Sequence, residues 1–223
     1  DNASYKGIDL MPLYDKFADK YYQNGFEDPK NNNMEENYFA SAHRVKFDLY
    51  MKYDLIAAAG DRHLAEYMPG NWYLKDPETV KKWKFNLTPV NYRIKSRKKL
   101  KKKSRRYVKE EEKFELSNSS EEGIDQIKAL LGLGEMVTNV NLPNTGQIDN
   151  LPLNTIVETN ALFRKDEIRP VNAGNIKLSI KQLMIPHVIN QEILFEAAKN
   201  HDKDLAFKAF LSDPLVRINR NEA

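Results

Sequence analysis

One highly basic segment divides this sequence and cannot enter a hydrophobic core. Residues 93–109 hold 11 of the chain's 35 lysines and arginines, with no aspartate or glutamate among them. The chain of 223 residues has a formal charge of +3, so taking away these 11 cations leaves −8. As a helix the segment would carry cations on every side, with Ile94 and Leu100 as isolated apolar positions. It is therefore predicted to be a solvated surface helix or a mobile excursion.

A basic run can also bind nucleic acid or anionic lipid by releasing counterions. The aromatic residues that flank this run are Tyr92 and Tyr107, and it carries no recognisable nucleic-acid-binding motif. A module that uses residues 93–109 to bind nucleic acid or another anionic partner is therefore the alternative function. Its affinity should fall steeply with salt.

Apolar residues recur at helical spacing on both sides of a short region with the alternation of β-strands. The expected strands cover residues 135–142 and 154–163, and the expected helices cover 9–23, 37–58, 77–85, 119–131, 176–200 and 202–212. Helices, then a small antiparallel strand region, then helices are typical of the α+β class. We expect one α+β domain over residues 1–223, with a basic insertion at about 93–113.

Local signals mark several ends of these helices. Asp76 is the expected start of the third helix, and Ser119 with Glu122 forms a capping box for the fourth. Gly60 is a suitable residue to follow the C-terminus of the second helix. Pro186 is expected to kink the long helix near the C-terminus.

Several classes of site are excluded by what the sequence lacks. It has no cysteine and no glycine-rich phosphate-binding motif, and its four histidines are scattered. A self-contained metal or nucleotide site is therefore not expected in this chain. No apolar run is long enough to cross a bilayer, so no membrane association and a cytoplasmic location are expected. The first residues contain neither an initiator Met nor a signal-peptide pattern, which suggests a fragment of a longer protein.

The first candidate site is the turn Gly60, Asp61, Arg62, His63. A carboxylate, a guanidinium and an imidazole together can abstract a proton, orient an anionic group and hold charge. The alternative is structural. Arg62 and His63 would then interact with the negative end of a preceding helix, and Asp61 would pair with Arg62.

The second candidate is the asparagine-rich segment between the two expected strands. Asn141, Asn144, Gly146 and Asn150 could present amides and backbone N–H groups to a polyhydroxylated ligand, because glycine allows close backbone approach. The alternative is an ordinary turn in which Asn, Pro and Gly serve the backbone geometry.

Taken together, two motifs resemble glycoside hydrolase family 4. One is GDRHLAEYMP at residues 60–69, and the other is NLPNTGQIDNLP at residues 141–152. The resemblance covers about residues 37–75 and 119–217, and it is greatest to the branch of α-galactosidases, α-glucuronidases and α-galacturonidases. The GDRH turn favours the members that act on uronic acids.

The resemblance implies a particular architecture. The family has an N-terminal Rossmann domain that binds NAD, and a C-terminal α+β portion similar to that of lactate and malate dehydrogenases. This chain resembles the C-terminal portion alone. A divalent metal, usually Mn²⁺, is held in the family by a Cys and a His that precede this region. NAD and Mn²⁺ are thus implied cofactors, with no metal ligand in this chain, and the fragment alone is expected to be inactive.

The resemblance also implies a mechanism and residue roles. The family oxidises the sugar at C3, removes the proton at C2, and expels the aglycone by elimination. Asp61 corresponds to the base. Arg62 and His63 would lie beside the substrate, at a uronate carboxylate. Asn141, Asn144 and Gly146 would line the sugar pocket or support the metal site. An α-glycoside or uronide substrate and a homodimer or homotetramer are the implied partners.

Overall fold

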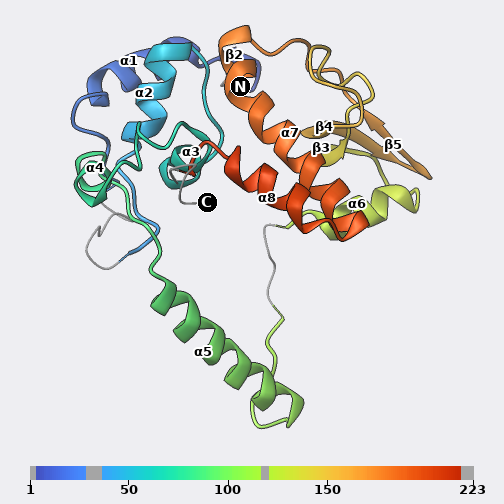
Figure 1. Ribbon diagram of the computed structural model, residues 1–223. Coiled ribbons are helices and arrows are strands. Elements are labelled where there is room, and N and C mark those ends of the chain that lie inside the picture. The colour runs from blue at the N-terminus through green and yellow to red at the C-terminus, as the bar shows by residue number, and fades with distance from the viewer. Residues whose placement is uncertain (1–3, 29–36, 117–120, 217–223) are drawn as a thin grey trace. The chain divides into compact units, whose positions relative to one another are not determined.

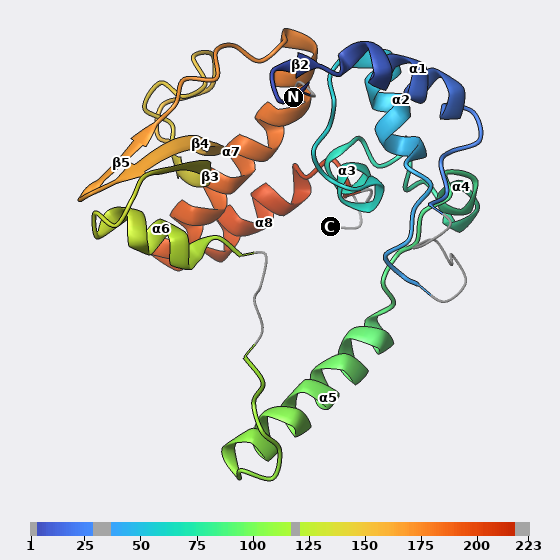
Figure 2. The ribbon, with the colours of Figure 1, turned by 180° about the vertical axis from the view of Figure 1, so that it is seen from behind.

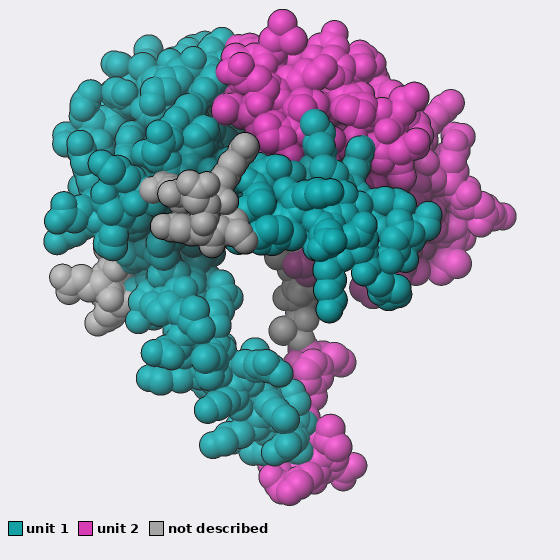
Figure 3. Space-filling model, in the orientation of Figure 1, with its two compact units in different colours: residues 1–106, 189–223 teal, residues 107–188 magenta. Residues whose placement is uncertain are grey.

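The computed structural model describes residues 4–28, 37–116 and 121–216, and it has the α+β composition expected from the sequence (Figure 1). The chain forms two compact units (Figure 3). Unit 1 comprises residues 1–106 and 189–223, and unit 2 comprises residues 107–188. That the whole chain folds as one domain stays a prediction.

Unit 1 is mainly helical. The short strands β1 (Ser4–Tyr5) and β2 (Ile8–Asp9) pair with each other. The helices of the N-terminal part are α1 (Met11–Tyr21), α2 (Arg44–Tyr53), α3 (Asp61–Tyr67), α4 (Pro77–Lys82) and α5 (Val90–Val108), and the last residues of α5, Tyr107 and Val108, belong to unit 2. Near the C-terminus, α8 (Lys203–Leu211) belongs to this unit, and α7 (Leu178–Asn200) spans the boundary between the units. The α7 helix continues through Pro186.

Helix α2 is the centre of unit 1 because it is buried on two sides. Val45 and Leu49 belong to one core cluster, which also contains Ala65 of α3. Phe47 and Tyr50 belong to a second cluster, which contains Ala18 of α1. The α2 helix therefore packs against the rest of unit 1 through more than one face.

The ends of α2 differ from the sequence prediction, which placed the helix over residues 37–58. Before the helix, the Ala42 N–H donates to the Lys84 carbonyl at 2.9 Å, and His43 has a positive φ of 57°. After it, Asp54 has a φ of 51° and donates its N–H to the Tyr50 carbonyl. Pairing with a distant segment and two left-handed residues thus shorten the helix. Gly60 precedes the first residue of α3 instead of ending α2.

Helix α5 contains most of the basic run and is exposed along its length, with no buried residue. It begins after Pro89, and Glu110 has a positive φ of 59° just beyond its end. Cations such as Lys98 and Lys102 stand four residues apart on it, a spacing that brings like charges together. The prediction of a solvated surface helix is confirmed.

Unit 2 contains an antiparallel sheet in the order β3 (Met136–Pro143), β4 (Ile156–Arg164), β5 (Glu167–Pro170). Figure 2 shows these strands side by side with α6 (Gly123–Leu130). Alternate residues of β4 are buried, and two of them, Ala161 and Phe163, pack with Ala129 of α6. The two expected strands are confirmed, and the short β5 was not predicted.

The helix predicted over residues 119–131 corresponds to α6. Glu122 precedes its first residue, and the Glu122 carboxylate accepts a hydrogen bond from the Thr138 hydroxyl of β3. Ser119, the other half of the expected capping box, lies outside the described residues. The Asp76 cap of α4 is confirmed, because its carboxylate accepts from the Thr79 N–H at 2.7 Å.

Candidate functional site

Asp61 opens helix α3 and is tied to the start of helix α2. Its side chain is buried, with 1% of the residue exposed. Its Oδ1 accepts a hydrogen bond from the Lys46 backbone N–H at 3.0 Å. A carboxylate at this place satisfies one of the free N–H groups of the first turn of α2. The alternative in which Asp61 pairs with Arg62 at the end of a helix is therefore wrong.

The other oxygen of this carboxylate, Asp61 Oδ2, is buried and has no hydrogen-bond partner among the described residues. Burial raises the pKa of the Asp61 carboxyl, while the N–H groups of Lys46 and Val45 and the charge of His43 lower it in part. A carboxylate with one oxygen fixed and a raised pKa is suited to accept a proton.

Tyr14 of α1 is a neighbour of this carboxylate that sequence reasoning missed. Its hydroxyl is also buried without a hydrogen-bond partner in the described part of the chain. Burial raises the pKa of the Tyr14 phenol, and the charge of Asp61 raises it further. Its ring packs edge-on against Tyr50, with 4.7 Å between the ring centroids. Buried oxygens of this kind normally bond to protein, water or ligand. Nothing in the neighbouring sequence marks Tyr14 as a site residue, because its position fits the apolar pattern of the α1 helix.

Arg62 contacts a different set of groups from Asp61. Its Nη1 donates to Thr88 Oγ1 at 2.6 Å, and its guanidinium carbon lies 4.7 Å from the centroid of the Phe39 ring. Its Nη2 lies 3.4 Å from His63 Nε2. His63 Nδ1 lies 3.4 Å from the Glu66 carboxylate on the same helix. Arg62 thus places a guanidinium group between the Phe39 ring and the His63 imidazole.

Asn144 organises the loop that follows β3. It is 1% exposed. Its Nδ2 donates to the carbonyls of Ile148, Leu151 and Pro152 at 2.9, 3.1 and 3.2 Å. Its Oδ1 accepts from the Ile148 N–H at 3.1 Å and from the Gly146 N–H at 3.3 Å. The polar atoms of this amide therefore bond within the loop.

Gly146 and Asn141 are placed differently from Asn144. Gly146 has a φ of +120°, a conformation that favours glycine, and a side-chain carbon there would meet no atom within 4 Å. It lines a hollow of about 170 Å³ together with Thr145, Gln147, Pro170 and Asn172. Asn141 lies on the exposed side of β3, opposite Glu158 in the register. The loop thus offers an open backbone position and an exposed amide, and the roles of these residues in binding stay predictions.

The predicted site residues fall into two groups. Asp61, Arg62 and His63 come together on α3 of unit 1. The residues predicted from the second motif come together in and beside one loop of unit 2, namely Asn141, Asn144 and Gly146.

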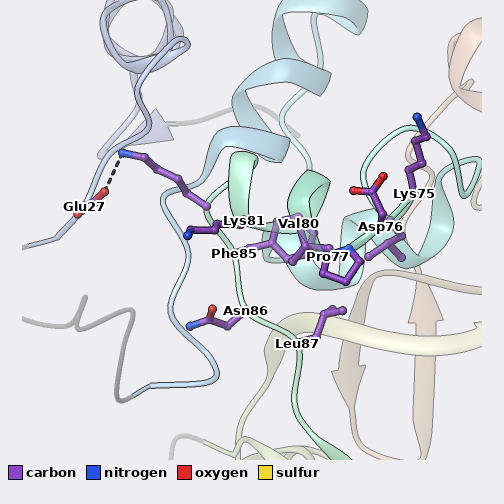
Figure 4. Close-up of a pocket in the computed structure, with 11 residues that line it drawn as sticks. Glu27, Lys75, Asp76, Pro77, Val80, Lys81, Phe85, Asn86 and Leu87 are labelled. Atoms are coloured by element: carbon purple, nitrogen blue, oxygen red, sulfur yellow. Dashed lines mark hydrogen bonds and ion pairs between the residues drawn. The ribbon is translucent and has the colours of Figure 1, made fainter.

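The described residues do not fit a divalent metal ion, because no three His, Asp or Glu side chains among them lie close enough to hold one. Within the same residues, no helix is both long and apolar enough to cross a membrane. A cavity of about 1090 Å³ in unit 1 lies beside α4 (Figure 4). Its lining includes Glu27, which pairs with Lys84 at 3.0 Å, and Asn86, but none of the predicted site residues.

Comparisons with known proteins give a consistent result. A family model described as the family 4 glycosyl hydrolase C-terminal domain matches residues 1–216. An α-galacturonidase from Thermoanaerobacter italicus is 56% identical over 217 residues, which are 97% of this chain and 48% of that protein. This chain spans about half the length of the curated relatives it matches.

Two solved structures extend the comparison. The crystal structure of lplD from Bacillus subtilis is 44% identical and has a TM-score of 0.88, and the match covers 99% of this chain and 50% of that chain. A 6-phospho-α-glucosidase from gut microorganisms, solved in complex with NAD and Mn²⁺, has a TM-score of 0.64 at 18% identity. That match covers 95% of this chain and 46% of the other, and at this identity it shows a shared fold.

Proposed function

Because this chain belongs to family 4 of the glycosyl hydrolases and matches their C-terminal domain, we propose that it is the substrate-side part of an α-galacturonidase. The observation that carries the proposal is the 56% identity to an α-galacturonidase over 97% of this chain. α-Glucuronides and α-galactosides are the next substrates to test, because enzymes for them make up the rest of the branch that the two motifs resemble.

Asp61 is the proposed base, which removes the proton at C2 of the sugar. Three features support this role: its fixed Oδ1, its raised pKa, and an Oδ2 that has no partner within the part of the chain that the structure describes. A base with a pKa closer to the working pH transfers protons more effectively. The bond from Lys46 holds the carboxylate in one orientation, so that Oδ2 is the oxygen left to take the proton.

Arg62 and His63 are the proposed contacts for the uronate carboxylate. The guanidinium of Arg62 donates to the neutral Thr88 hydroxyl, so its remaining N–H groups can serve an anion. In unit 2, the exposed amide of Asn141 and the open backbone at Gly146 are proposed to contact sugar hydroxyls. We assign Asn144 to holding that loop in shape, since its amide bonds within it.

NAD and Mn²⁺ are the proposed cofactors of the complete protein. The neighbour solved with both of them supports this, and so does the family resemblance. In that chemistry the cofactors supply reversible oxidation of the sugar and polarisation of its carbonyl group. The described residues of this chain do not form a metal site, so we assign the metal ligands to the other half of the protein. A cytoplasmic homodimer or homotetramer is proposed for the whole.

The test uses the full-length protein, in which this chain is joined to the half that its relatives carry. Hydrolysis of p-nitrophenyl α-galacturonide, α-glucuronide and α-galactoside is measured with and without NAD and Mn²⁺. We expect turnover that needs both and is fastest on the galacturonide. Asp61→Asn should lower kcat about 10³-fold. The matched control is Asp54→Asn, the same change at an exposed left-handed position that tolerates asparagine.

The outcomes separate the parts of the proposal. If Asp61→Asn keeps full activity, Asp61 is not the base, although the enzyme class stands. Absence of turnover on every substrate, together with no NAD binding, would overturn the function. Turnover by the isolated 223-residue chain would contradict the assignment of the cofactors to the other half. Binding to DNA or RNA through α5 would instead support the alternative of an anion-binding module.

A further inference from the structure

Helices α1 and α3 meet one face of α2 and bring a tyrosine close to the Asp61 carboxylate. Lys46 and Tyr50 stand four residues apart on α2, so they lie on one face, about 6 Å apart along the helix axis. Asp61 of α3 accepts the hydrogen bond from the Lys46 N–H at 3.0 Å. Tyr14 of α1 packs edge-on against Tyr50, with 4.7 Å between the ring centroids. Burial raises the pKa of the Tyr14 phenol, and the charge of Asp61 raises it further, which places the two groups within electrostatic range.

Both side chains are held in place, and each ends in a buried oxygen that lacks a partner. The bond from Lys46 fixes the Asp61 carboxylate. The hydroxyl of Tyr50 donates to the Asp15 carboxylate of α1, which ties α1 to the ring that supports Tyr14. Neither Asp61 Oδ2 nor the Tyr14 hydroxyl has a hydrogen-bond partner within residues 4–28, 37–116 and 121–216. Polar groups in a protein interior are costly when unpaired, and ordered water normally satisfies those that the protein does not.

The remaining charged and titratable groups around Asp61 have other roles. Burial raises the pKa of Asp61, and the charges of His43 and Lys46 at the start of α2 are among the influences that lower it. Tyr73 follows α3, and burial, its hydrogen bond to Asp48 and the charge of Asp61 all raise the pKa of its phenol. Its hydroxyl donates to Asp48 at 2.6 Å, so it is already engaged. The charged side chains of α3 itself bond elsewhere, Arg62 to Thr88 and His63 to Glu66.

We propose that Tyr14 is a positioning residue for Asp61, whose hydroxyl donates through one bridging water molecule to Oδ2 and keeps the buried carboxylate ionised. This inference rests on the proposed function, in which Asp61 is the base. A hydrogen bond to the charged form of a carboxyl favours that form, so Tyr14 opposes the effect of burial. A carboxylate oxygen accepts more than one hydrogen bond, so Oδ2 keeps a lone pair for the proton of the sugar. The two fixed oxygens supply the polar partners that a buried water needs.

The first experiment measures the pH dependence of kcat/KM on the full-length protein with p-nitrophenyl α-galacturonide. The acid limb of this profile reports the base of the free enzyme. We expect Tyr14→Phe, which keeps the ring and its packing on Tyr50, to move the limb upward by about 0.5–1 pH unit. Below the limb this is a loss of about three- to tenfold, and at higher pH the loss should be much smaller. The matched control, Tyr21→Phe, removes a hydroxyl from the same helix and core cluster and should leave the limb in place.

Infrared titration provides a second readout that does not depend on turnover. The difference between the wild-type protein and Asp61→Asn isolates the band of the protonated Asp61 carboxyl. The same difference is then recorded in the Tyr14→Phe background. We expect the band to appear at a pH that is higher by the same 0.5–1 unit, about the shift of the acid limb. A purely structural role for Tyr14 would change stability and leave this titration where it is.

The outcomes separate this inference from the proposed function. The role of Tyr14 is overturned if Tyr14→Phe moves neither the acid limb nor the infrared titration, moves them downward, or moves them no more than Tyr21→Phe does. A shift of the infrared band without a shift of the limb also overturns it, because Asp61 then does not govern the reaction. Failure of the proposed function is a different result, namely no turnover by the wild-type protein whatever the infrared titration shows.

Discussion

The Lys46 backbone N–H donates to the Asp61 carboxylate at 3.0 Å, and this bond joins the first turns of α2 and α3. One oxygen is thereby fixed at a helix N-terminus, and the other is buried without a partner among the described residues. Burial would cost less if the group were neutral, which is why its pKa is raised. The buried carboxylate lowers the stability of the fold, and it is ready to take a proton.

Asp61→Asn should therefore stabilise the fold at neutral pH while it removes activity. Because the folded-state pKa of Asp61 is raised, the folded protein binds this proton more tightly than the unfolded chain does. The wild type consequently loses stability as the pH rises from the ordinary carboxyl pKa of about 4 through the raised value. Urea unfolding of wild type and variant between about pH 4 and pH 7.5 checks this. The difference should favour the variant more at the higher pH, and a difference that shrinks as the pH rises contradicts it.

Asn144→Ala should destabilise unit 2 strongly. The change leaves three carbonyls and two N–H groups of the loop without the amide that joins them. We expect a loss of about 2–4 kcal/mol in the free energy of unfolding. Asn141→Ala, at an exposed position on β3, should cost less than about 0.5 kcal/mol. Denaturant titrations of the two variants give the comparison, and equal losses would show that Asn144 does not hold the loop.

Gly25→Ala should be far more disruptive than its exposure suggests. Gly25 has a φ of +78°, and a Cβ there would lie 2.6 Å from the Cβ of Ala42 and 2.7 Å from its carbonyl oxygen. We expect a loss of about 2–4 kcal/mol from the combined steric and backbone strain. Gly123→Ala is the control, since that position opens α6 and a Cβ added there would meet no atom within 4 Å. Thermal melting should separate the variants by several degrees.

Alkaline pH should unfold the protein through its buried tyrosines. Burial and a hydrogen bond of 2.6 Å to Asp48 raise the pKa of the Tyr73 phenol. The hydrogen bond from Tyr50 to Asp15, together with burial, raises the pKa of Tyr50 to about 12. A raised folded-state pKa stabilises the fold below the ordinary value of about 10, and this stabilisation is lost as the pH rises further.

The measurement is the free energy of unfolding between about pH 8 and pH 12. Tyr73→Phe should cost about 1–3 kcal/mol at pH 8, because Asp48 loses a donor in a buried place. It should also flatten the decline above about pH 10. An unchanged slope in Tyr73→Phe would mean that other groups govern the alkaline transition. The exposed Tyr5 provides a control substitution to Phe that should alter neither quantity.

Local pattern predicted much of the secondary structure, and its errors have a common physical cause. The helical spacing located α1, α7 and α8 closely, and the alternation located β3 and β4. The predicted start of α2 was wrong because residues 40–43 pair with a segment more than 40 residues later in the sequence. The strand β5 has four residues, which is too short for its alternation to stand out.

The candidate site, too, could be predicted only in part from the sequence. The motifs located Asp61 and Asn144, since each stands in a recognisable run of residues. Their partners could not be predicted, because the Lys46 N–H is a backbone group with no identity in the sequence. Phe39 gave no signal either, because an isolated Phe comes to lie beside Arg62 of α3 only when the chain folds.

The hydrogen bonds of the Asn144 loop also affect the chemical degradation of this protein over time. Asparagine deamidates when the N–H nitrogen of the following residue attacks the side-chain amide, and asparagine counts among the heat-sensitive residues for such reasons. Here the Asn144 amide is held by five bonds, and the attacking nitrogen of Thr145 is itself engaged by the Gln147 side chain. The hydrogen bonds that shape the loop therefore restrain both reacting groups. Asn144 should therefore resist deamidation for as long as unit 2 stays folded. Deamidation should begin at exposed asparagines such as Asn24, which precedes a glycine.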